Sequence, residues 1–292
     1  MKVEVARLRV LIIADRTDAP FRYRCIHAAL QLRAAGALAN VVSLSEPELP
    51  LAVARYSVIV AFRLRWDERV ERVVDAARRA GVPLIFDCDD LIFDERAVPL
   101  LPFVREDADA RAKYSEEVRA VERTFRACDA FVGSTPALAD WAARAGKPSH
   151  VHPNVVPDEY FALAPRLASR ERSGPTIGYF AGSNTHDLDF GVAVPALWRV
   201  LETQPGARLI LGGFLDAGVA LSGVEQRVVR LPFLSHRTLP IAYAACDVTI
   251  APIAEINAFT DGKSALKFFE PGALRIPVVA TPIAAMRAAI VH

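Results

Sequence analysis

The chain has 292 residues, 52% of them hydrophobic, and its 35 basic residues almost balance its 34 acidic ones. A chain of this length exceeds the usual size of one hydrophobic core and predicts two domains of about 150 residues each. The net charge of +1 argues against general binding of nucleic acid, which favours a basic excess. The four cysteines lie far apart, without disulfide or zinc-site spacing, so we expect reduced thiols in a cytoplasmic protein and no bound metal.

Strand-like and helix-like segments alternate through the first half of the chain. The run RVLIIA at 9–14 is apolar from its second residue on and rich in β-branched residues, as is typical of a strand buried on both faces of a parallel sheet. Alternation of this kind predicts a doubly wound α/β domain. The predicted strands cover 9–14, 39–44, 57–62, 83–87, 130–134 and 149–154, and the predicted helices cover 23–32, 67–80, 108–127 and 136–145.

Residues 157–175 are polar and contain prolines, and we interpret them as the connection between two domains at 1–165 and 166–292. The alternation then resumes, which predicts a second α/β domain. The apolar segments are shorter than a membrane-spanning helix, so we expect at most peripheral contact with a membrane. In this half the predicted strands cover 176–182, 207–213, 228–233, 247–253 and 276–281, and the predicted helices cover 187–203, 236–245 and 263–274.

The residues that follow each strand are the candidates for function, because open α/β sheets bind ligands at the carboxyl ends of their strands. Gly182, Ser183 and His186 follow the first strand of the second half. A loop of small residues before a helix lets backbone N–H groups approach a phosphate, whose charge the helix N-terminus favours. The loop matches no established phosphate-binding motif, and an ordinary turn explains it equally well.

A second candidate set lies in the last predicted helix. Lys263, Lys267 and Glu270 are spaced i, i+4 and i+7, which predicts that they share one face of that helix. Two ammonium groups and a carboxylate on such a face suit a diphosphate and a ribose. Apolar neighbours indicate a buried helix, which rarely carries two lysines without a partner. The alternative is a solvated helix face with a weak ion pair.

Asp87, Asp89 and Asp90 cluster directly after a predicted strand, in PLIFDCDDLIFDE. Carboxylates are costly to place together, so a ligand-binding role for Asp89 or Asp90 is one hypothesis. The loop also looks like the nucleophile loop of haloacid-dehalogenase-type phosphatases, in which Asp87 and Asp89 would act with Mg²⁺. That alternative is less favoured, because Leu91 replaces the expected hydroxyl residue and the loop follows a fourth strand. In a third interpretation the acids cap the next turn.

Arg22 and Arg24 lie at the start of the first predicted helix. Cationic side chains oppose the helix dipole at that end, so their presence indicates an anionic ligand nearby. A solvent-exposed basic turn is an equal alternative.

Several segments resemble the retaining GT-B-fold glycosyltransferases usually grouped as family 4. The resemblance is strongest after residue 175, in TIGYFAGSNTHDLDF, RLPFLSHRTLPIAYAACDVTIAPI and FTDGKSALKFFEPGALRIPVVATP, and the first half adds VGSTPALADW and HVHPNVVPDEYF. It implies two Rossmann-like, doubly wound parallel-sheet domains facing a cleft, with a nucleotide donor in the second and an acceptor in the first. The family usually continues through further helices, so we expect a carboxyl-terminal domain that is incomplete at its end.

The resemblance also implies roles for single residues. Lys263 and Lys267 would neutralise diphosphate charge as the glycosidic bond breaks, and Glu270 would bind the ribose hydroxyls. Pro271 and Arg275 depart from the family pattern, and proline disfavours the α conformation of the residue before it. The implied catalytic residues are Lys263, Lys267, Asp89 and Asp90, the donor-binding residues are Gly182, Ser183, His186, Asp261 and Glu270, and the acceptor-side residues are Arg22 and Arg24.

The resulting hypothesis is a glycosyltransferase that moves a sugar from a nucleotide diphosphate donor to an acceptor hydroxyl, with retention, in cell-surface glycan or polysaccharide synthesis. The resemblance implies a glycan or lipid-linked acceptor, no cofactor, and a cytoplasmic location with peripheral contact at the inner membrane face. A second hypothesis is a non-catalytic module that binds a nucleotide or a sugar. The Mg²⁺-dependent phosphatase using Asp87 and Asp89 is the third.

Overall fold

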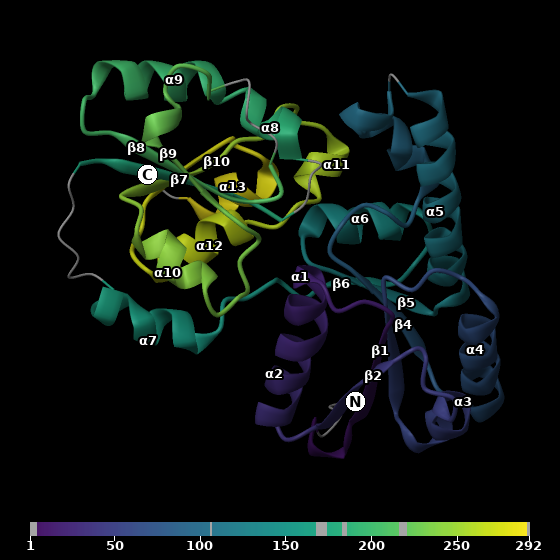
Figure 1. Ribbon diagram of the computed structural model, residues 1–292. Helices are drawn as coiled ribbons and strands as arrows, with labels where there is room; N and C mark the ends of the chain where they lie inside the picture. The colour runs from purple at the N-terminus through teal and green to yellow at the C-terminus, as the bar shows by residue number, and fades with distance from the viewer. Residues whose placement is uncertain (1–4, 106, 168–173, 183–185, 216–220, 291–292) are drawn as a thin grey trace. The chain divides into compact units, whose positions relative to one another are not determined.

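The computed structural model describes residues 5–105, 107–167, 174–182, 186–215 and 221–290. Their contacts divide the chain into two compact units (Figure 1). Unit 1 comprises Met1–Asn154 and Asn257–Ser264, and unit 2 comprises Val155–Ile256 and Ala265–His292. The expected boundary after residue 165 therefore lies inside helix α7 (Asp158–Leu167), which packs against α10 and α12 of unit 2.

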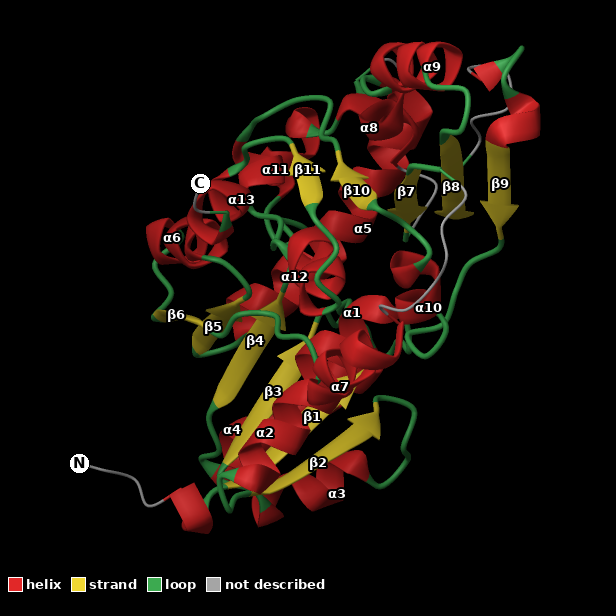
Figure 2. Cartoon of the chain, turned by 90° about the vertical axis from the view of Figure 1, so that its left-hand side faces the viewer, coloured by secondary structure: helices red, strands yellow, loops and turns green. Residues whose placement is uncertain are grey.

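Unit 1 contains a sheet of six parallel strands in the order β2-β1-β3-β4-β5-β6 (Figure 2). All six predicted strands of the first half are confirmed, with ends that differ by a few residues. The order reverses between β1 and β3, and such a switch point opens a crevice at the carboxyl ends of the two strands. The strands are β1 (Arg9–Ala14), β2 (Leu38–Ser43), β3 (Val58–Phe62), β4 (Leu84–Cys88), β5 (Ala130–Gly133) and β6 (Ser149–Val151).

Helices cover both faces of this sheet, because alternate residues of each strand point to opposite sides. On β1, Val10 and Ile12 join a core with Ala29 of α2, whereas Leu11 and Ile13 join the larger core formed with α4 and α5. The helices of unit 1 are α1 (Ala19–Phe21), the π-helical η2 (Arg22–His27), α2 (Ala28–Ala34), α3 (Leu49–Ala52), α4 (Glu68–Ala80), α5 (Ala108–Ala127), α6 (Pro136–Arg144) and α11 (Ala258–Asp261), with short 3-10 turns at Val5–Arg7, Val53–Arg55, Glu95–Leu100 and Pro102–Val104.

Unit 2 contains a sheet of five parallel strands in the order β11-β10-β7-β8-β9, and its switch point lies between β7 and β10. All five predicted strands of the second half are confirmed. The strands are β7 (Thr176–Ala181), β8 (Arg208–Gly213), β9 (Val228–Leu231), β10 (Val248–Ala251) and β11 (Val278–Ala280), and the helices are α7, α8 (Asp187–Gly191), α9 (Val194–Thr203), α10 (Leu239–Ala244), α12 (Leu266–Ala273) and α13 (Ala284–Ala289), with a 3-10 turn, η8, at Glu225–Arg227.

Two predictions for the second half are wrong in detail. The expected helix at 187–203 is divided into α8 and α9, and Pro195 stands in the first turn of α9, where its missing N–H costs nothing. The expected linker at 157–175 contains α7, which buries Tyr160 and Ala164 in unit 2. The expected helix at 263–274 is confirmed as α12, although it begins only at Leu266.

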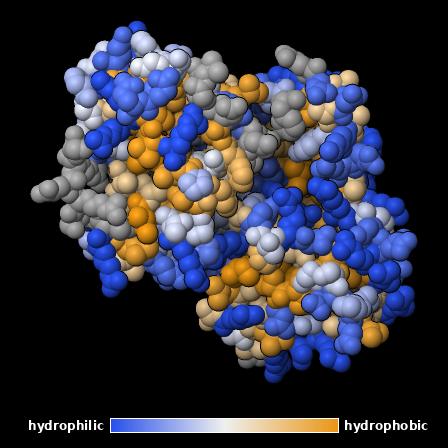
Figure 3. All heavy atoms as spheres, viewed as in Figure 1, coloured by the Kyte–Doolittle hydropathy of each residue, from blue (hydrophilic) through white to orange (hydrophobic). Residues whose placement is uncertain are grey.

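The surface of the described residues is mixed. Figure 3 shows hydrophilic residues spread over both units with apolar residues between them. None of the described helices is long and apolar enough to cross a membrane.

Helix α12 ends at a residue with a left-handed backbone conformation. The N–H of Ile276 donates to the carbonyl oxygen of Pro271 (3.0 Å), and the N–H of Arg275 donates to that of Gly272 (2.9 Å). This pair of bonds forms a Schellman cap, whose αL position is usually glycine. Arg275 occupies it with a φ of 63°.

Replacing Arg275 by glycine removes this backbone strain, so R275G is expected to raise the free energy of unfolding by about 0.5–1 kcal/mol. Urea denaturation measures the change. R275A is the control, because alanine keeps a Cβ at the strained φ. A midpoint for R275G no higher than for R275A would contradict the assignment.

Asp94 is a buried acid that joins three segments of unit 1. It caps the 3-10 turn at Glu95–Leu100, and its carboxylate accepts hydrogen bonds from Arg96 Nη2 (2.6 Å) and Trp141 Nε1 (2.8 Å). Burial alone would raise the pKa of Asp94, but these hydrogen bonds outweigh burial and lower it. A lowered pKa stabilises the fold above the unfolded-state pKa, and this stabilisation is lost as the pH falls through the folded-state pKa.

The variant D94N is therefore expected to be less stable than the wild type at pH 7. As the pH falls below about 5, the free energy of unfolding of D94N should decrease less than that of the wild type, since the amide does not titrate. Urea midpoints at several pH values test this difference, and parallel curves for the two proteins would show that Asp94 contributes nothing to the acid dependence.

Candidate functional site

The first candidate site lies at the carboxyl end of the sheet in unit 1, and it is built around a buried ion pair. Arg24 is 1% exposed and Asp87 is 4% exposed. Arg24 Nε donates to Asp87 Oδ1 (2.8 Å) and Nη2 donates to Asp87 Oδ2 (2.6 Å). Nη1 of Arg24 donates to the carbonyl oxygen of His152 and to Asn154 Oδ1 (3.2 Å). The bidentate geometry uses both oxygens of Asp87.

These contacts correct the prediction for Arg24. The sequence indicated an anionic ligand near the helix start, and the anion is Asp87 of the same chain. Arg24 is therefore paired in the interior of unit 1 and is not accessible to a ligand, which contradicts its predicted place among the acceptor-side residues. Arg22 is half-buried and lies in the same π-helical turn.

A second cluster of charges follows β3 and β4. Arg63 Nε lies 2.8 Å from Asp89 Oδ1, and Arg63 Nη2 lies 3.7 Å from Asp90 Oδ2. Burial raises the pKa of Asp89 more than the guanidinium groups of Arg63 and Arg24 lower it. The side chain of Asp89 is 9% exposed, whereas that of Asp90 is 25% exposed. Of the two predicted catalytic acids, Asp90 is thus the one that a ligand can reach.

The backbone around this cluster is held tightly. Burial raises the pKa of Cys88 to about 12, so its thiol stays protonated and donates to the carbonyl oxygen of Asp90 (3.0 Å). Arg63 has a φ of 48°. A left-handed conformation at a non-glycine residue is strained, and such strain concentrates at functional sites.

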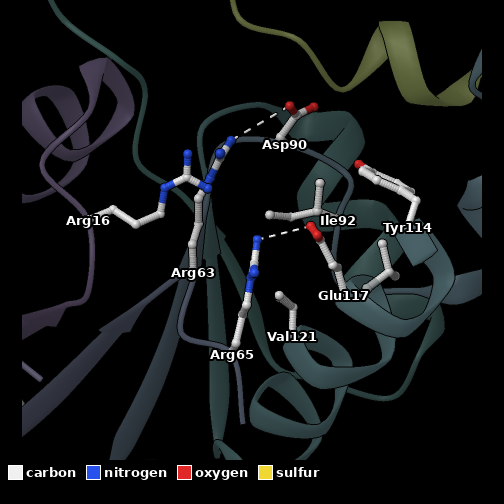
Figure 4. A pocket seen from close by; sticks show the side chains of 9 residues that line it. Arg16, Arg63, Arg65, Asp90, Ile92, Tyr114, Glu117 and Val121 are labelled. Atoms are coloured by element: carbon white, nitrogen blue, oxygen red, sulfur yellow. Dashed lines mark hydrogen bonds and ion pairs between the residues drawn. The ribbon is translucent and has the colours of Figure 1, made fainter. Parts of the chain in front are cut away.

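A cavity of about 160 Å³ lies beside Asp90, wholly within unit 1. Arg65 Nη2 donates to Glu117 Oε2 (3.0 Å) on its wall, and Figure 4 shows this pair next to the contact between Arg63 and Asp90. The polar residues that line the cavity are Arg16, Arg63, Arg65, Asp90, Tyr114 and Glu117.

The second candidate site lies in unit 2, at the switch point between β7 and β10. Lys267 of α12 reaches Tyr179 of β7, with Nζ 3.5 Å from the phenol oxygen and 4.6 Å from the ring centroid. The hydroxyl of Tyr179 donates to the carbonyl oxygen of His186 (3.5 Å). Burial, followed by the nearby acids Asp189 and Asp187, raises the pKa of Tyr179, so the phenol stays neutral beside the ammonium group.

The loop after β7 is tied to the loop after β10 by Asp189. Its carboxylate contacts His186 Nδ1 (3.1 Å) and accepts a hydrogen bond from the backbone N–H of Ala254 (2.9 Å). Gly182 is exposed at the end of β7. Ser183 lies outside the described residues. The structure therefore brings the predicted residues Lys267 and His186 into one network.

Glu270 is 6% exposed and accepts a hydrogen bond from the hydroxyl of Tyr243 (2.9 Å). The helix α12 continues through Pro271, so the departure from the family pattern leaves Glu270 helical. Binding of Glu270 to a ribose stays a prediction.

The segment Asn257–Ser264 carries the remaining predicted residues and belongs to unit 1. Thr135 Oγ1 donates to the carbonyl oxygen of Gly262 (3.0 Å), and Asn154 Nδ2 donates to Ser264 Oγ (3.1 Å). Asn257 Nδ2 donates to the carbonyl oxygen of Leu100 (2.9 Å), and Phe259 is buried in the core with α5. Packing of this segment against the first half explains why the helix predicted from residue 263 begins only at Leu266.

Lys263 therefore lies outside α12 and does not share a helix face with Lys267 and Glu270, so the prediction of one face for the three residues is wrong. Asp261 ends α11, and Lys263 lies after it with Nζ 5.0 Å from the ring centroid of Phe259. By contact these two residues belong to unit 1, whereas Lys267 and Glu270 belong to unit 2.

An exposed aromatic pair in unit 2 was missed by the sequence analysis. Phe214 and Phe233 are 51% and 50% exposed, and their rings stack with centroids 5.2 Å apart and an interplanar angle of 26°. They follow β8 and β9, so they lie at the same edge of the sheet as Gly182. The available signal was Phe214 directly after the predicted strand 207–213 and Phe233 at the end of the predicted strand 228–233.

Among the described residues, no group of three or more His, Cys, Asp or Glu side chains is arranged to hold a metal ion. The four cysteines are buried and form no disulfide.

No protein-family model matches the sequence, and comparison with curated proteins gives no match. Solved structures do match it along almost its whole length. WaaG, a glycosyltransferase involved in lipopolysaccharide biosynthesis, is 13% identical with a TM-score of 0.61, over 96% of this chain and 83% of that one. Alr3699/HepE of Anabaena, solved with UDP and glucose, is 14% identical with a TM-score of 0.58, over 98% and 84%.

A UDP-forming α,α-trehalose-phosphate synthase of Burkholderia xenovorans is 12% identical with a TM-score of 0.56, over 95% of this chain and 85% of that one. The chain has the GT-B fold. Both sheets are entirely parallel and doubly wound, as the sequence predicted. Identities this low show the fold alone, and a fold does not determine a reaction.

The buried ion pair of Arg24 and Asp87 can be tested by measuring the stability of variants. Removing one partner of a buried ion pair leaves an uncompensated charge, so R24M and D87L should each lower the free energy of unfolding by about 3–5 kcal/mol. The double variant should lose less than the sum of the two, since neither charge remains. Urea denaturation of all four proteins measures the coupling. Additive losses would contradict the pairing.

Proposed function

We propose that the chain is a glycosyltransferase that moves a sugar from a nucleotide diphosphate donor held by unit 2 to a hydroxyl group of an acceptor held by unit 1. The observation that carries the proposal is the position of Lys267, beside Tyr179 and the loop after β7, at the switch point of the second sheet. Ligands of open α/β sheets bind at such points. The same fold occurs in the glycosyltransferase WaaG, in a UDP-forming trehalose-phosphate synthase and in HepE, which was solved with UDP and glucose, and this supports the same conclusion.

The chemical task is to stabilise the diphosphate as it leaves. Lys267 would supply positive charge where negative charge develops, and Tyr179 below it holds the ammonium group without adding a competing charge. Exposed backbone at Gly182 would let N–H groups approach the phosphates. Lys263 stays a predicted participant from unit 1.

The stacked rings of Phe214 and Phe233 would hold the base of the nucleotide. Stacking on an aromatic side chain contributes about 1–3 kcal/mol per base and tolerates different bases. The pair lies at the ligand-binding edge of the sheet and keeps about half of each ring accessible.

Three finer points of the proposal come from the family resemblance: retention, a glycan or lipid-linked acceptor, and a role in cell-surface glycan synthesis at the inner face of a membrane. The anomeric configuration of a product, read by NMR, tests retention.

The phosphatase alternative requires Asp87 as a nucleophile. Both of its carboxylate oxygens bind the guanidinium of Arg24 in the interior of unit 1, which leaves no accessible oxygen for attack on a phosphoester. The non-catalytic alternative is a module that binds a nucleotide or a sugar. It differs from the transferase only in that it does not convert the donor to product.

Calorimetric titration with UDP, GDP and dTDP, without added metal, tests the donor site. One of these nucleotides should bind the wild type, and K267A should bind it about ten- to a hundredfold more weakly, because a charge-assisted hydrogen bond is lost. F233A should weaken binding by about five- to a hundredfold through lost stacking.

The control is K113A, which removes an exposed lysine from α5 of unit 1. Equal binding by wild type, K267A and F233A would reject the site. Release of the free nucleotide from the corresponding nucleotide sugar, in the presence of acceptors, then separates a transferase from a binding module.

A further inference from the structure

We propose that the cavity beside Asp90 in unit 1 binds one uncharged sugar unit, and that this unit is part of the acceptor. The second statement rests on the proposed transferase activity, whereas the first rests only on the chemistry of the cavity. The proposal excludes acceptors whose phosphate or carboxylate group would occupy this cavity.

The size of the cavity limits the ligand to one small group. Its volume is about 160 Å³. Sites for drug-sized ligands are roughly 300–1,000 Å³, so the cavity suits a single ring.

The charges of the lining are balanced by the chain itself. Arg63 is paired with Asp89 and Asp90, Arg65 is paired with Glu117, and Arg16 contacts Asp18. An anion entering the cavity would gain little from guanidinium groups that already have carboxylate partners. It would also be repelled by Asp90 and Glu117.

A neutral sugar does not meet this repulsion, because each hydroxyl group both donates and accepts hydrogen bonds. Carboxylate oxygens of Asp90 and Glu117 would accept from sugar hydroxyls, and the guanidinium of Arg65 would donate to them. Burial, followed by the charge of Asp90, raises the pKa of Tyr114, so its phenol remains a neutral donor on the same wall.

The remaining wall is apolar and rigid. Ile92, Val118 and Val121 line the cavity, and the two valines are 2% and 3% exposed. Figure 4 shows Ile92 between the two pairs of charged side chains and Val121 beside the pair of Arg65 and Glu117. A sugar ring matches this combination, since its C–H face is apolar and its hydroxyl groups surround it.

The strained backbone at Arg63 supports a built site. With a φ of 48°, Arg63 directs its guanidinium toward Asp89 and Asp90 directly after β3. Strain of this kind persists only where the surrounding structure imposes it. Arg63, on the cavity wall, thereby sets the direction of the Asp90 carboxylate.

The test is saturation-transfer NMR on the full chain, with methyl glycosides of glucose, galactose, mannose and N-acetylglucosamine as neutral probes. Glucose 6-phosphate and methyl glucuronide are the charged probes. The variants are E117Q and R65Q, each at a side chain that is 37% and 55% exposed respectively, so both should fold. The matched control is E116Q, the same change at the neighbouring exposed position of α5, outside the cavity.

At least one neutral glycoside should bind the wild type and E116Q equally, and more tightly than either charged probe. E117Q should bind it about tenfold more weakly, since a hydrogen bond to a charged acceptor is lost. Tighter binding of glucose 6-phosphate or the glucuronide, weakened by R65Q, would overturn the proposal. Equal binding of neutral probes by E117Q and E116Q, or no binding of any, would also overturn it.

A parallel UDP titration separates this proposal from the proposed function. Nucleotide binding without sugar binding would reject the cavity alone. Sugar binding by the cavity without any nucleotide binding or turnover would reject the transferase and retain the cavity as a sugar site.

Discussion

The guanidinium of Arg24 is buried in unit 1 and joins three separate parts of the chain: its own helical turn, the end of β4 and the residues after β6. It holds Asp87 at the end of β4, the carbonyl oxygen of His152 and the side chain of Asn154. Asn154 in turn donates to Ser264. A charge in such a place is tolerated only when its partners are all in position. The ends of β4 and β6 and the segment Asn257–Ser264 are therefore mutually dependent.

This dependence explains the neighbouring charges. Asp87 neutralises Arg24 inside the unit, while Asp89 and Asp90, which follow it on the same loop, are balanced by Arg63. The three aspartates thus have different environments. Asp87 is paired with Arg24 in the interior, Asp89 is nearly buried beside Arg63, and Asp90 lines the cavity.

The two units contain the same kind of sheet but carry different side chains near its carboxyl edge. Unit 1 surrounds its cavity with balanced pairs of charges, which suits hydroxyl groups. Unit 2 places a lysine, small-residue backbone and two exposed aromatic rings at the carboxyl edge of its sheet, which suits a nucleotide diphosphate. Our proposal, that a sugar is transferred from a nucleotide to a hydroxyl group, requires both kinds of site.

The sequence by itself predicted all eleven strands and the two doubly wound sheets, because short apolar or β-branched segments alternate with helix-like segments along both halves, and central strands such as β1, buried on both faces, require continuous apolar runs. It also indicated the loops that carry Asp90 and His186 and the helix that carries Lys267. Tertiary structure alone decided which charges neutralise each other, since Arg24 and Asp87 are 63 positions apart. It also decided that Asn257–Ser264 packs on unit 1, so that Lys263 is not part of the helix for which local spacing suggested it. The reason is that pairing and packing depend on partners distant in sequence, which periodicity does not record.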